Sequence, residues 1–431
     1  MSLQLQSLLG LLVLPLLAWV MSEQRGAIQG LRLVRVAVAG IGLQLAIAAV
    51  MLTVPASRVA FDWAAQLVTA LQGATNAGTR LVFGYLAGAP APFDAIRPEN
   101  GFVLALEALP LVLLISALSR LLYHWGVLQR IVAAIGWVLE RAFSLTGPVG
   151  TSAAANIFVG MVEAPLLVRP YLRDMSRADL FATMTVGMAT VAGTVLALYA
   201  TVLEPRLAGA AGHLMVASVI SVPAALMISA LMVPQTSASG PRDTQPATSS
   251  ASLVVLDEPS RSSVDAIAQG TRDGVVLLVN ITAMLIVSVA LVALANKTLG
   301  ALSAPFGMAL TIEGMLGWIC APLAWLIGVP SSEAGTAGAL IGIKTVLNEL
   351  VAYLRLAATA PEALSERSRL LLAYALCGFA NFGSLGIMIG GMVAMVPERR
   401  AEIVSLGGKT IISGTLATLM TAAAVGVLTP G

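Results

Sequence analysis

Long apolar stretches alternate with short polar segments along most of the 431 residues. A helix that crosses a bilayer needs about 20 apolar residues. Eight stretches meet that requirement: residues 4–22, 33–54, 101–122, 178–203, 211–233, 273–296, 370–396 and 408–429. The pattern predicts an all-α polytopic membrane protein with about eight transmembrane helices.

Two further regions are apolar but interrupted by Gly, Pro, Ser and charged residues, at about 146–172 and 331–357. Each is long enough for two half-helices that meet inside the membrane. An amphipathic, Trp-containing segment precedes each region (127–143 and 310–328), and a span with a polar motif follows it ("TVAGT", 190–194, and "GFANFGS", 378–384). The two halves of the chain therefore contain the same order of elements.

The arginines indicate how these elements cross the membrane. Arg25, Arg32 and Arg35 follow the first span, whereas residues 1–22 carry no charged side chain. Because cytoplasmic loops are enriched in Lys and Arg, the first loop is expected inside and the N-terminus outside. When the predicted spans are counted from the N-terminus, the first interrupted region enters the membrane from the cytoplasm and the second enters from outside. We therefore predict two re-entrant helical hairpins in an inverted repeat, the arrangement that surrounds the midplane site of many transporters.

These patterns divide the chain into five parts. A Ser-, Thr- and Pro-rich stretch of low hydrophobicity separates the halves and is typical of a linker. The predicted parts are N-terminal scaffold helices at 1–125, with an external amphipathic segment at 57–85, a first transport repeat at 126–233, a cytoplasmic linker at 234–264, a scaffold helix at 265–300, and a second transport repeat at 301–431.

Composition agrees with a membrane protein and narrows its chemistry. Hydrophobic residues make up 58% and charged residues 11% of the chain, against about 25% charged in soluble domains. The net charge of +2 is too small to indicate a nucleic-acid partner. The two Cys and two His residues show no metal-site spacing, and no HExxH or Ser/His motif is present. We expect no enzyme activity and no cofactor, only a coupling ion.

Two carboxylates stand in the interrupted regions, Glu163 and Glu349. An acid at membrane depth costs several kcal/mol unless it is paired or protonated, so it indicates a functional site. The structural alternative is a carboxylate that caps the tip of a hairpin. Lys344, five residues before Glu349, either pairs with a hairpin carboxylate in the site or has a structural role.

Two polar sets accompany these acids. Asn381 and Ser384 lie three residues apart and share a helix face, and with Phe379 they offer an amide, a hydroxyl and a ring to a sugar-like ligand. Helix–helix packing is the alternative. Asn156 and Thr190, with the carbonyls of Val159 and Val191, could form an oxygen cage for sodium.

Four motifs together resemble the concentrative nucleoside transporter family: "SAAANIFVGMVEAPLLVRPYL", "ATVAGTVLALYA", "IGIKTVLNELVAY" and "CGFANFGSLGI". They occur in the family's order and spacing over most of residues 101–429. The resemblance implies eight spans, two re-entrant hairpins and a homotrimer in the lipid bilayer of a bacterial cytoplasmic (inner) membrane. It also implies a cation-driven symporter that imports nucleosides by an elevator-type movement.

The resemblance also implies roles for individual residues. Glu349, Asn381 and Ser384 would hold the ribose hydroxyls, and Phe379 would line the pocket. The remaining substrate-binding positions are Met161, Val162, Glu163 and Val195. The family's sodium site corresponds to Asn156, Val159, Thr190 and Val191, with Thr190 in place of the more usual serine.

One departure from the family pattern concerns the first hairpin. The family usually has Gly-Gln-Thr-Glu or Gly-Gln-Ser-Glu, whose Gln and hydroxyl face the nucleobase, but this chain has Gly160, Met161, Val162 and Glu163. Because polar pairing provides most discrimination for a polar edge, base recognition should change. The ligand is therefore a nucleoside with altered base preference, or another ribosyl or diol-bearing molecule. Sodium and proton coupling both remain open.

Overall fold

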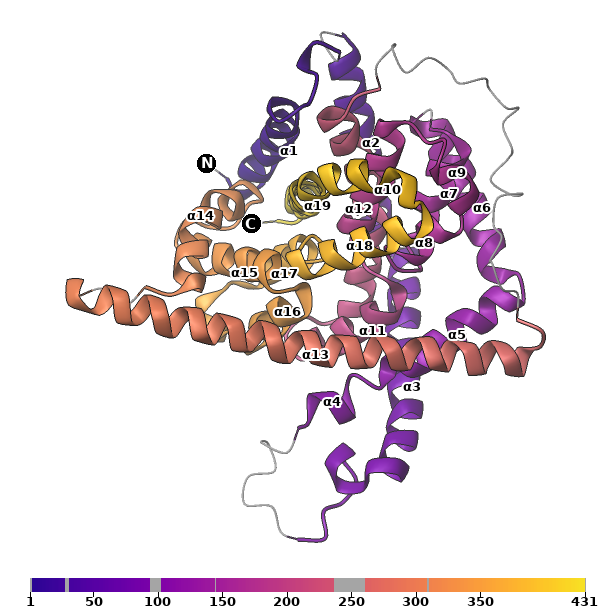
Figure 1. The fold of residues 1–431 in the computed structure, drawn as a ribbon. Coiled ribbons are helices and arrows are strands. Elements are labelled where there is room, and N and C mark those ends of the chain that lie inside the picture. The colour runs from indigo at the N-terminus through magenta and orange to yellow at the C-terminus, as the bar shows by residue number, and fades with distance from the viewer. Residues whose placement is uncertain are drawn as a thin grey trace.

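The computed structural model describes residues 2–27, 31–93, 102–143, 145–235, 260–307 and 310–430. Within these residues every regular element is a helix (Figure 1). This confirms the predicted all-α class. Most of the predicted linker 234–264 lies outside the described residues.

Seven helical segments among the described residues are long and apolar enough to cross a membrane: Leu3–Val20, Arg35–Thr53, Leu104–His124, Arg177–Leu203, Ala210–Met232, Ser263–Phe306 and Pro397–Leu428. They correspond to seven of the eight predicted spans. The eighth, 370–396, is divided into α17 (Glu366–Ala375) and α18 (Phe382–Met395). The span Arg177–Leu203 is divided in the same way into α10 (Arg177–Ala189) and α11 (Gly193–Leu203). Each half of the chain thus contains one broken span.

The interrupted regions form short helices, as their sequence predicts. The first contains α7 (Gly147–Ala155), α8 (Glu163–Leu166) and α9 (Arg169–Leu172), and the second contains α15 (Ala334–Val346) and α16 (Glu349–Ala358). They follow α6 (Val127–Phe143) and α14 (Ile312–Leu326). The remaining helices are α1 (Leu3–Val20), α2 (Leu31–Thr53), α3 (Pro55–Phe83), α4 (Leu104–Glu107), α5 (Leu111–His124), α12 (Ala210–Met232), α13 (Ser263–Ser303) and α19 (Arg400–Leu428), with short 3₁₀ turns between some of them.

The long helix α13 lies across one side of the molecule and packs against α5 (Figure 1). Its 41 residues correspond to a length of about 60 Å, roughly twice the hydrocarbon thickness of a bilayer. Ser262 begins the helix by accepting a hydrogen bond from the Asp265 N–H. Most of its described apolar side chains are exposed on the isolated chain, as expected for a surface that faces lipid or another subunit.

The helix α19 forms the centre of the bundle and packs against α1, α2, α10, α12, α17 and α18. Its buried hydroxyl groups bond to these neighbours. Ser413 pairs with Thr185 of α10 at 2.8 Å, and Thr421 pairs with Ser221 of α12 at 3.0 Å. Gln44 of α2 donates to the same Thr421 hydroxyl at 3.2 Å. These bonds, with close packing of small residues, connect the helices where apolar burial alone gives little driving force.

Two buried arginines in the first turn of α17 bind the ends of other helices. Arg367 donates to the carbonyl of Gly426 at 2.8 Å and to that of Thr429 at 2.6 Å, at the end of α19. Arg369 donates to the Ala360 carbonyl at 2.6 Å, just beyond α16. The last carbonyls of a helix lack intrahelical partners and carry partial negative charge. These guanidinium groups therefore join the ends of α16 and α19 to α17.

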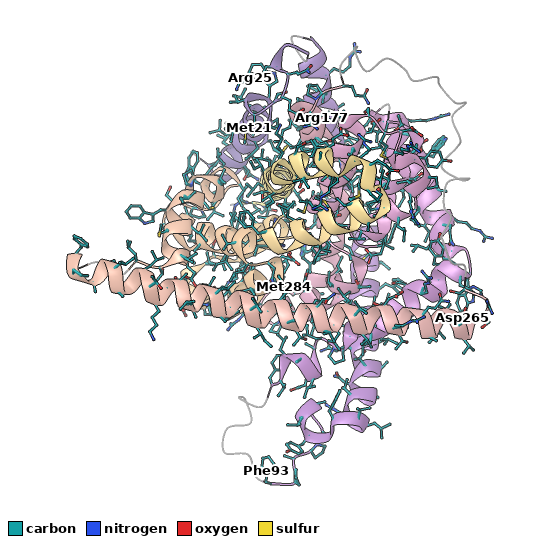
Figure 2. All side chains as sticks on the ribbon, viewed as in Figure 1. Met21, Arg25, Phe93, Arg177, Asp265 and Met284 are labelled. Carbon is teal, nitrogen blue, oxygen red and sulfur yellow. The ribbon has the colours of Figure 1, made fainter. Side chains whose placement is uncertain are left out.

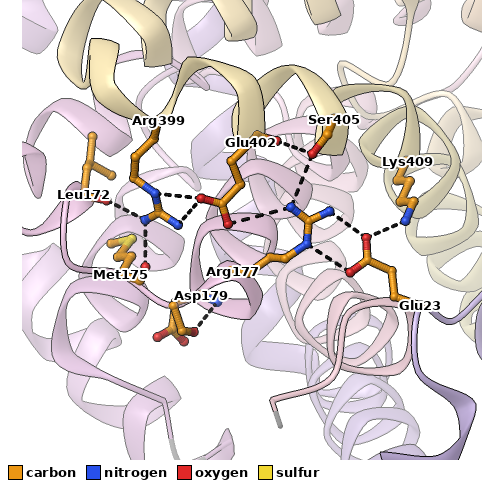
Figure 3. A network of polar contacts seen from close by, with 10 residues as sticks. Glu23, Leu172, Met175, Arg177, Asp179, Arg399, Glu402, Ser405 and Lys409 are labelled. Atoms are coloured by element: carbon orange, nitrogen blue, oxygen red, sulfur yellow. Dashed lines mark hydrogen bonds and ion pairs between the residues drawn. The ribbon is translucent and has the colours of Figure 1, made fainter. Parts of the chain in front are cut away.

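A polar network joins three segments at one end of the bundle (Figure 3). Glu23, after α1, accepts two bonds from Arg177 at 2.7 and 3.0 Å and one from Lys409 at 2.5 Å. Glu402 binds Arg399 at 2.6 Å and lies 3.7 Å from Arg177. Arg177, Arg399 and Lys409 thus lie at the same end of the bundle as the first loop, which is expected on the cytoplasmic side.

The Glu23 carboxylate gives a pH-dependent contribution to stability. The hydrogen bond from Arg177, and then that from Lys409, lower the pKa of Glu23 from 4.5 to about 2, although burial opposes this. Because the pKa is lowered on folding, the contribution is present above pH 4.5 and is lost as the pH falls towards 2. After screening by solvent it amounts to about 1 kcal/mol.

We expect Glu23→Gln to lower the unfolding temperature in detergent by about 1–2 °C at pH 7, and the difference from wild type to vanish towards pH 2. The unfolding temperature at each pH is measured from the change in Trp fluorescence on heating. The matched control is Glu398→Gln, at an exposed carboxylate that should leave the midpoint unchanged. A Glu23→Gln difference that does not vary with pH would contradict the argument.

Candidate functional site

The two broken spans and the first interrupted region meet through backbone hydrogen bonds. The N–H of Gly193, which opens α11, donates to the Phe158 carbonyl of that region at 2.9 Å. The N–H of Phe379, between α17 and α18, donates to the Thr190 carbonyl between α10 and α11 at 3.3 Å. The backbone N–H and carbonyl groups that lack an intrahelical partner at a break are thus hydrogen-bonded to another broken element. This arrangement brings the polar motifs of both repeats together.

Glu349 is buried at the start of α16, in the second interrupted region. Its Oε1 accepts a hydrogen bond from the Tyr199 hydroxyl at 2.6 Å, and its Oε2 accepts one from Asn381 Nδ2 at 2.8 Å. The carboxylate is thus held by two neutral donors, one from α11 and one from the start of α18. The predicted association of Glu349 with Asn381 is present as a direct contact.

Asn381 fixes the start of α18 as well as contacting Glu349. Its Oδ1 accepts the Ser384 N–H at 2.7 Å, which is the N-cap bond of this helix. Ser384 therefore lies one turn into α18, next to Asn381, as the spacing predicts. A methyl group on Gly383 would lie 3.3 Å from Cε of Met284 on α13, whose position is marked in Figure 2. The long helix therefore covers this end of the site.

Lys344 is fully buried in α15 but binds no hairpin carboxylate among the described residues. Its ammonium donates to the Thr418 hydroxyl at 2.9 Å and to the Ala375 carbonyl at 3.1 Å. Of the two alternatives for Lys344, these contacts favour the structural role. The Ala375 carbonyl is a suitable partner because α17 ends there and this carbonyl carries the partial negative charge of the helix terminus.

The residues expected to hold sodium lie where α7 meets α10. Asn156 ends α7 and is 1% exposed; its Nδ2 donates to the Ser152 carbonyl, and its Oδ1 has no hydrogen-bond partner among the described residues. A methyl group on Gly187 of α10 would lie 3.7 Å from this oxygen. Thr190 follows Gly187 by three residues, so both lie on the same side of α10. A buried, unpartnered amide oxygen fits a hard cation, which prefers oxygen ligands.

Two main-chain carbonyls complete this set. Val159 and Val191 lie outside the helices, and in the described part of the chain neither carbonyl accepts a hydrogen bond from a backbone N–H. The Thr190 hydroxyl donates to the Val186 carbonyl at 2.9 Å, so its lone pairs remain available. These four residues have the chemistry to hold sodium.

The remaining substrate-binding candidates of the first interrupted region, Met161, Val162 and Glu163, do not form a single cluster. A methyl group on Gly187 would lie 3.0 Å from Met161 Cβ, and one on Gly391 of α18 would lie 2.7 Å from Val162 Cγ1. Gly391 is ten residues beyond Asn381, or about 15 Å along the helix. Val162 therefore packs well away from Asn381. Glu163 is exposed, its carboxylate lies over Gly160, and no described contact joins it to Glu349.

Val195 and Tyr199 occupy one face of α11. They are four residues apart, so Val195 lies one turn from the tyrosine that contacts Glu349. Tyr199 was missed by the sequence analysis. The available signal was a lone tyrosine in the apolar stretch "TVLALYATVL", since a buried tyrosine hydroxyl requires a partner.

Comparison with known proteins identifies the family. Residues 213–426 match the description "Na+ dependent nucleoside transporter C-terminus", residues 9–86 match its "N-terminus", and residues 105–206 match "Nucleoside recognition". The chain belongs to the concentrative nucleoside transporter family. It is a membrane transporter and not an enzyme, and the family uses a coupling ion rather than a bound cofactor.

Relatives and solved structures resemble this transporter over nearly its whole length. An uncharacterized transporter of Haemophilus influenzae is 39% identical over 98% of this chain and 97% of its own. Nucleoside permease NupC of Helicobacter pylori is 36% identical over 98% and 97%. A structure of CNTnw in an inward-facing substrate-bound state has a TM-score of 0.87 at 36% identity, covering 99% of this chain and 98% of that one.

Proposed function

We propose that the protein is a cation-coupled symporter that imports nucleosides across a bacterial inner membrane, working as a homotrimer with an elevator-type movement of its transport repeats. The observation that carries the proposal is the buried contact between Glu349 and Asn381. It joins the second hairpin to the break between α17 and α18. The neighbouring Ser384 and Phe379 add a hydroxyl and an aromatic ring.

The chemistry of this cluster suits a ribose. The Glu349 carboxylate accepts hydrogen bonds from hydroxyl groups, and the Asn381 amide and the Ser384 hydroxyl offer both donors and acceptors. Bonds to a buried charged acceptor are stronger than neutral ones. A sugar that lacks a hydroxyl would leave buried polar atoms unpaired, which costs about 1–3 kcal/mol for each group.

Sodium is the coupling ion that the residues favour. Support comes from the unpartnered Asn156 Oδ1 and from the free carbonyls of Val159 and Val191. With the Thr190 hydroxyl they would form a neutral oxygen cage, in which sodium binding needs no proton to leave. Proton coupling would instead use Glu163 or Glu349.

A second candidate keeps the transporter but changes the ligand to another ribosyl or diol-bearing compound. The observation that favours it is the apolar pair Met161 and Val162, at positions where the resemblance to the family implies a Gln and a hydroxyl that face the nucleobase. Both side chains pack against glycines of neighbouring helices. The sugar end of the site is unaffected by this difference.

Glu349→Gln is expected to reduce nucleoside uptake to background, because the neutral amide loses a charged acceptor and places an N–H donor in the site. The measurement is uptake of labelled uridine and adenosine into proteoliposomes, with sodium and proton gradients imposed separately. Glu107→Gln, at a carboxylate that accepts the Val103 N–H within another span, is the matched control. Undiminished uptake by Glu349→Gln would remove this residue from the site.

Asn156→Leu is expected to raise the half-saturating sodium concentration for uptake about tenfold, the effect of losing about 1.4 kcal/mol of binding. The nucleoside affinity at saturating sodium should change little. Asn280→Leu, at an exposed position on α13, provides the same exchange away from the site. If wild-type uptake responds to a proton gradient and not to sodium, the sodium assignment is wrong.

The double change Met161→Gln with Val162→Thr tests the choice between nucleosides and other ligands. Both replacements preserve volume, so binding of pyrimidine nucleosides should strengthen about tenfold if two polar base contacts are restored. A thermal-shift screen over nucleosides, nucleobases and sugars measures the change. Met161→Leu with Val162→Ile alters packing without adding polar groups and should have no such effect. Wild-type stabilisation by a non-nucleoside diol alone would favour the second candidate.

A further inference from the structure

We propose that Tyr199 is a positioning residue that sets the specificity of the site for a vicinal diol, because its hydroxyl donates to the Glu349 carboxylate and fixes the orientation of that group. This inference rests on the proposed nucleoside site. Tyr199 would act through Glu349 and would not itself need to touch the substrate.

The geometry of the contact is direct. The Tyr199 hydroxyl donates to Glu349 Oε1 at 2.6 Å, and the tyrosine is only 2% exposed. Tyr199 lies on α11, in the first repeat, whereas Glu349 opens α16 in the second hairpin. The bond therefore fixes the carboxylate relative to the opposite repeat.

The ring of Tyr199 is held in place by a second tyrosine. Its centroid lies 5.0 Å from that of Tyr353 on α16, with the planes tilted by 39°. The Tyr353 hydroxyl donates elsewhere, to the Ala373 carbonyl at 2.9 Å. Two buried tyrosines thus pack together, but only Tyr199 has a described hydrogen bond to Glu349. Tyr353 is therefore a matched control residue for Tyr199.

The number of acceptor positions on the carboxylate explains the predicted specificity. Each carboxylate oxygen offers two lone-pair positions. Tyr199 occupies one on Oε1 and Asn381 occupies one on Oε2, so one position on each oxygen remains after the side-chain hydrogen bonds of the described residues. Two hydroxyl groups on adjacent carbons match this remaining pair, whereas a deoxy sugar fills only one of them.

Removal of the Tyr199 hydroxyl would affect this arrangement in two ways. The carboxylate could rotate about its terminal bond, and its charged form would lose a donor that stabilises it in a buried position. A protonated carboxyl has less acceptor capacity and presents a donor of its own. Both effects weaken binding of a diol more than binding of a deoxy sugar.

The experiment compares Tyr199→Phe with Tyr353→Phe, using uptake of uridine and 2′-deoxyuridine over a range of pH. For Tyr199→Phe we expect the half-saturating concentration to rise about tenfold for uridine and about twofold or less for 2′-deoxyuridine. The acidic pH at which uptake falls to half should move upward, since the other titratable groups that face Glu349, Lys344 of α15 and Cys377, are the same in both proteins. Tyr353→Phe should change both substrates equally and leave the pH profile unchanged, because its hydroxyl does not contact Glu349.

Equal losses for the two substrates in Tyr199→Phe, with an unshifted pH profile, would overturn the positioning role. If that variant does not fold, 4-aminophenylalanine at position 199 supplies a second test, since its amine donates to the same oxygen and should preserve the preference for uridine. Loss of the preference there would also overturn the role. Absence of wild-type uptake of either nucleoside overturns the proposed function and this inference with it, whereas wild-type uptake that Tyr199→Phe leaves unaltered overturns this inference alone.

Discussion

Broken helices inside a bilayer leave backbone groups that lipid cannot satisfy, and the rest of this structure depends on how those groups are paired. Each unpaired N–H or carbonyl costs several kcal/mol in hydrocarbon. Here the elements pair with one another: Gly193 donates to Phe158, and Phe379 donates to Thr190. The breaks can therefore exist only where the first interrupted region and both broken spans meet. This requirement places polar side chains of distant segments in one buried region.

Much of the fold follows from the sequence, because hydrophobic length and helix-breaking residues are local properties. The interrupted regions around Glu163 and Glu349 are visible as Gly, Pro and charge within apolar stretches, and both are broken in the structure. The division of 370–396 was not predicted. Its residues are mostly apolar, and the polar motif at 378–384 does not by itself indicate a helix break. The break at Leu376–Asn381 is stabilised by tertiary bonds, including the one from Phe379 to Thr190, that no local pattern contains.

The site was predictable where a residue type has few alternatives and unpredictable where its partner comes from elsewhere in the fold. Glu349 and Asn381 were recognisable because carboxylates and amides are rare at this depth. Tyr199 was not singled out, since tyrosine also packs as an apolar ring. For Lys344 the sequence left a carboxylate partner and a structural role open, and in the structure its ammonium binds the end of α17 and a hydroxyl of α19. Partner choice for a buried group depends on three-dimensional proximity.

The hydrogen bond from Phe379 to the Thr190 carbonyl has a thermodynamic consequence. Thr190 belongs to the proposed cation set, and Phe379 belongs to the proposed substrate pocket. An ion that orders the chain at Thr190 also orders the segment that carries Phe379, so each ligand reduces the ordering entropy that the other must overcome. Reciprocity then requires the ion to raise substrate affinity by the same factor by which the substrate raises ion affinity. A single backbone bond between the two breaks would thus contribute to the coupling free energy that symport requires.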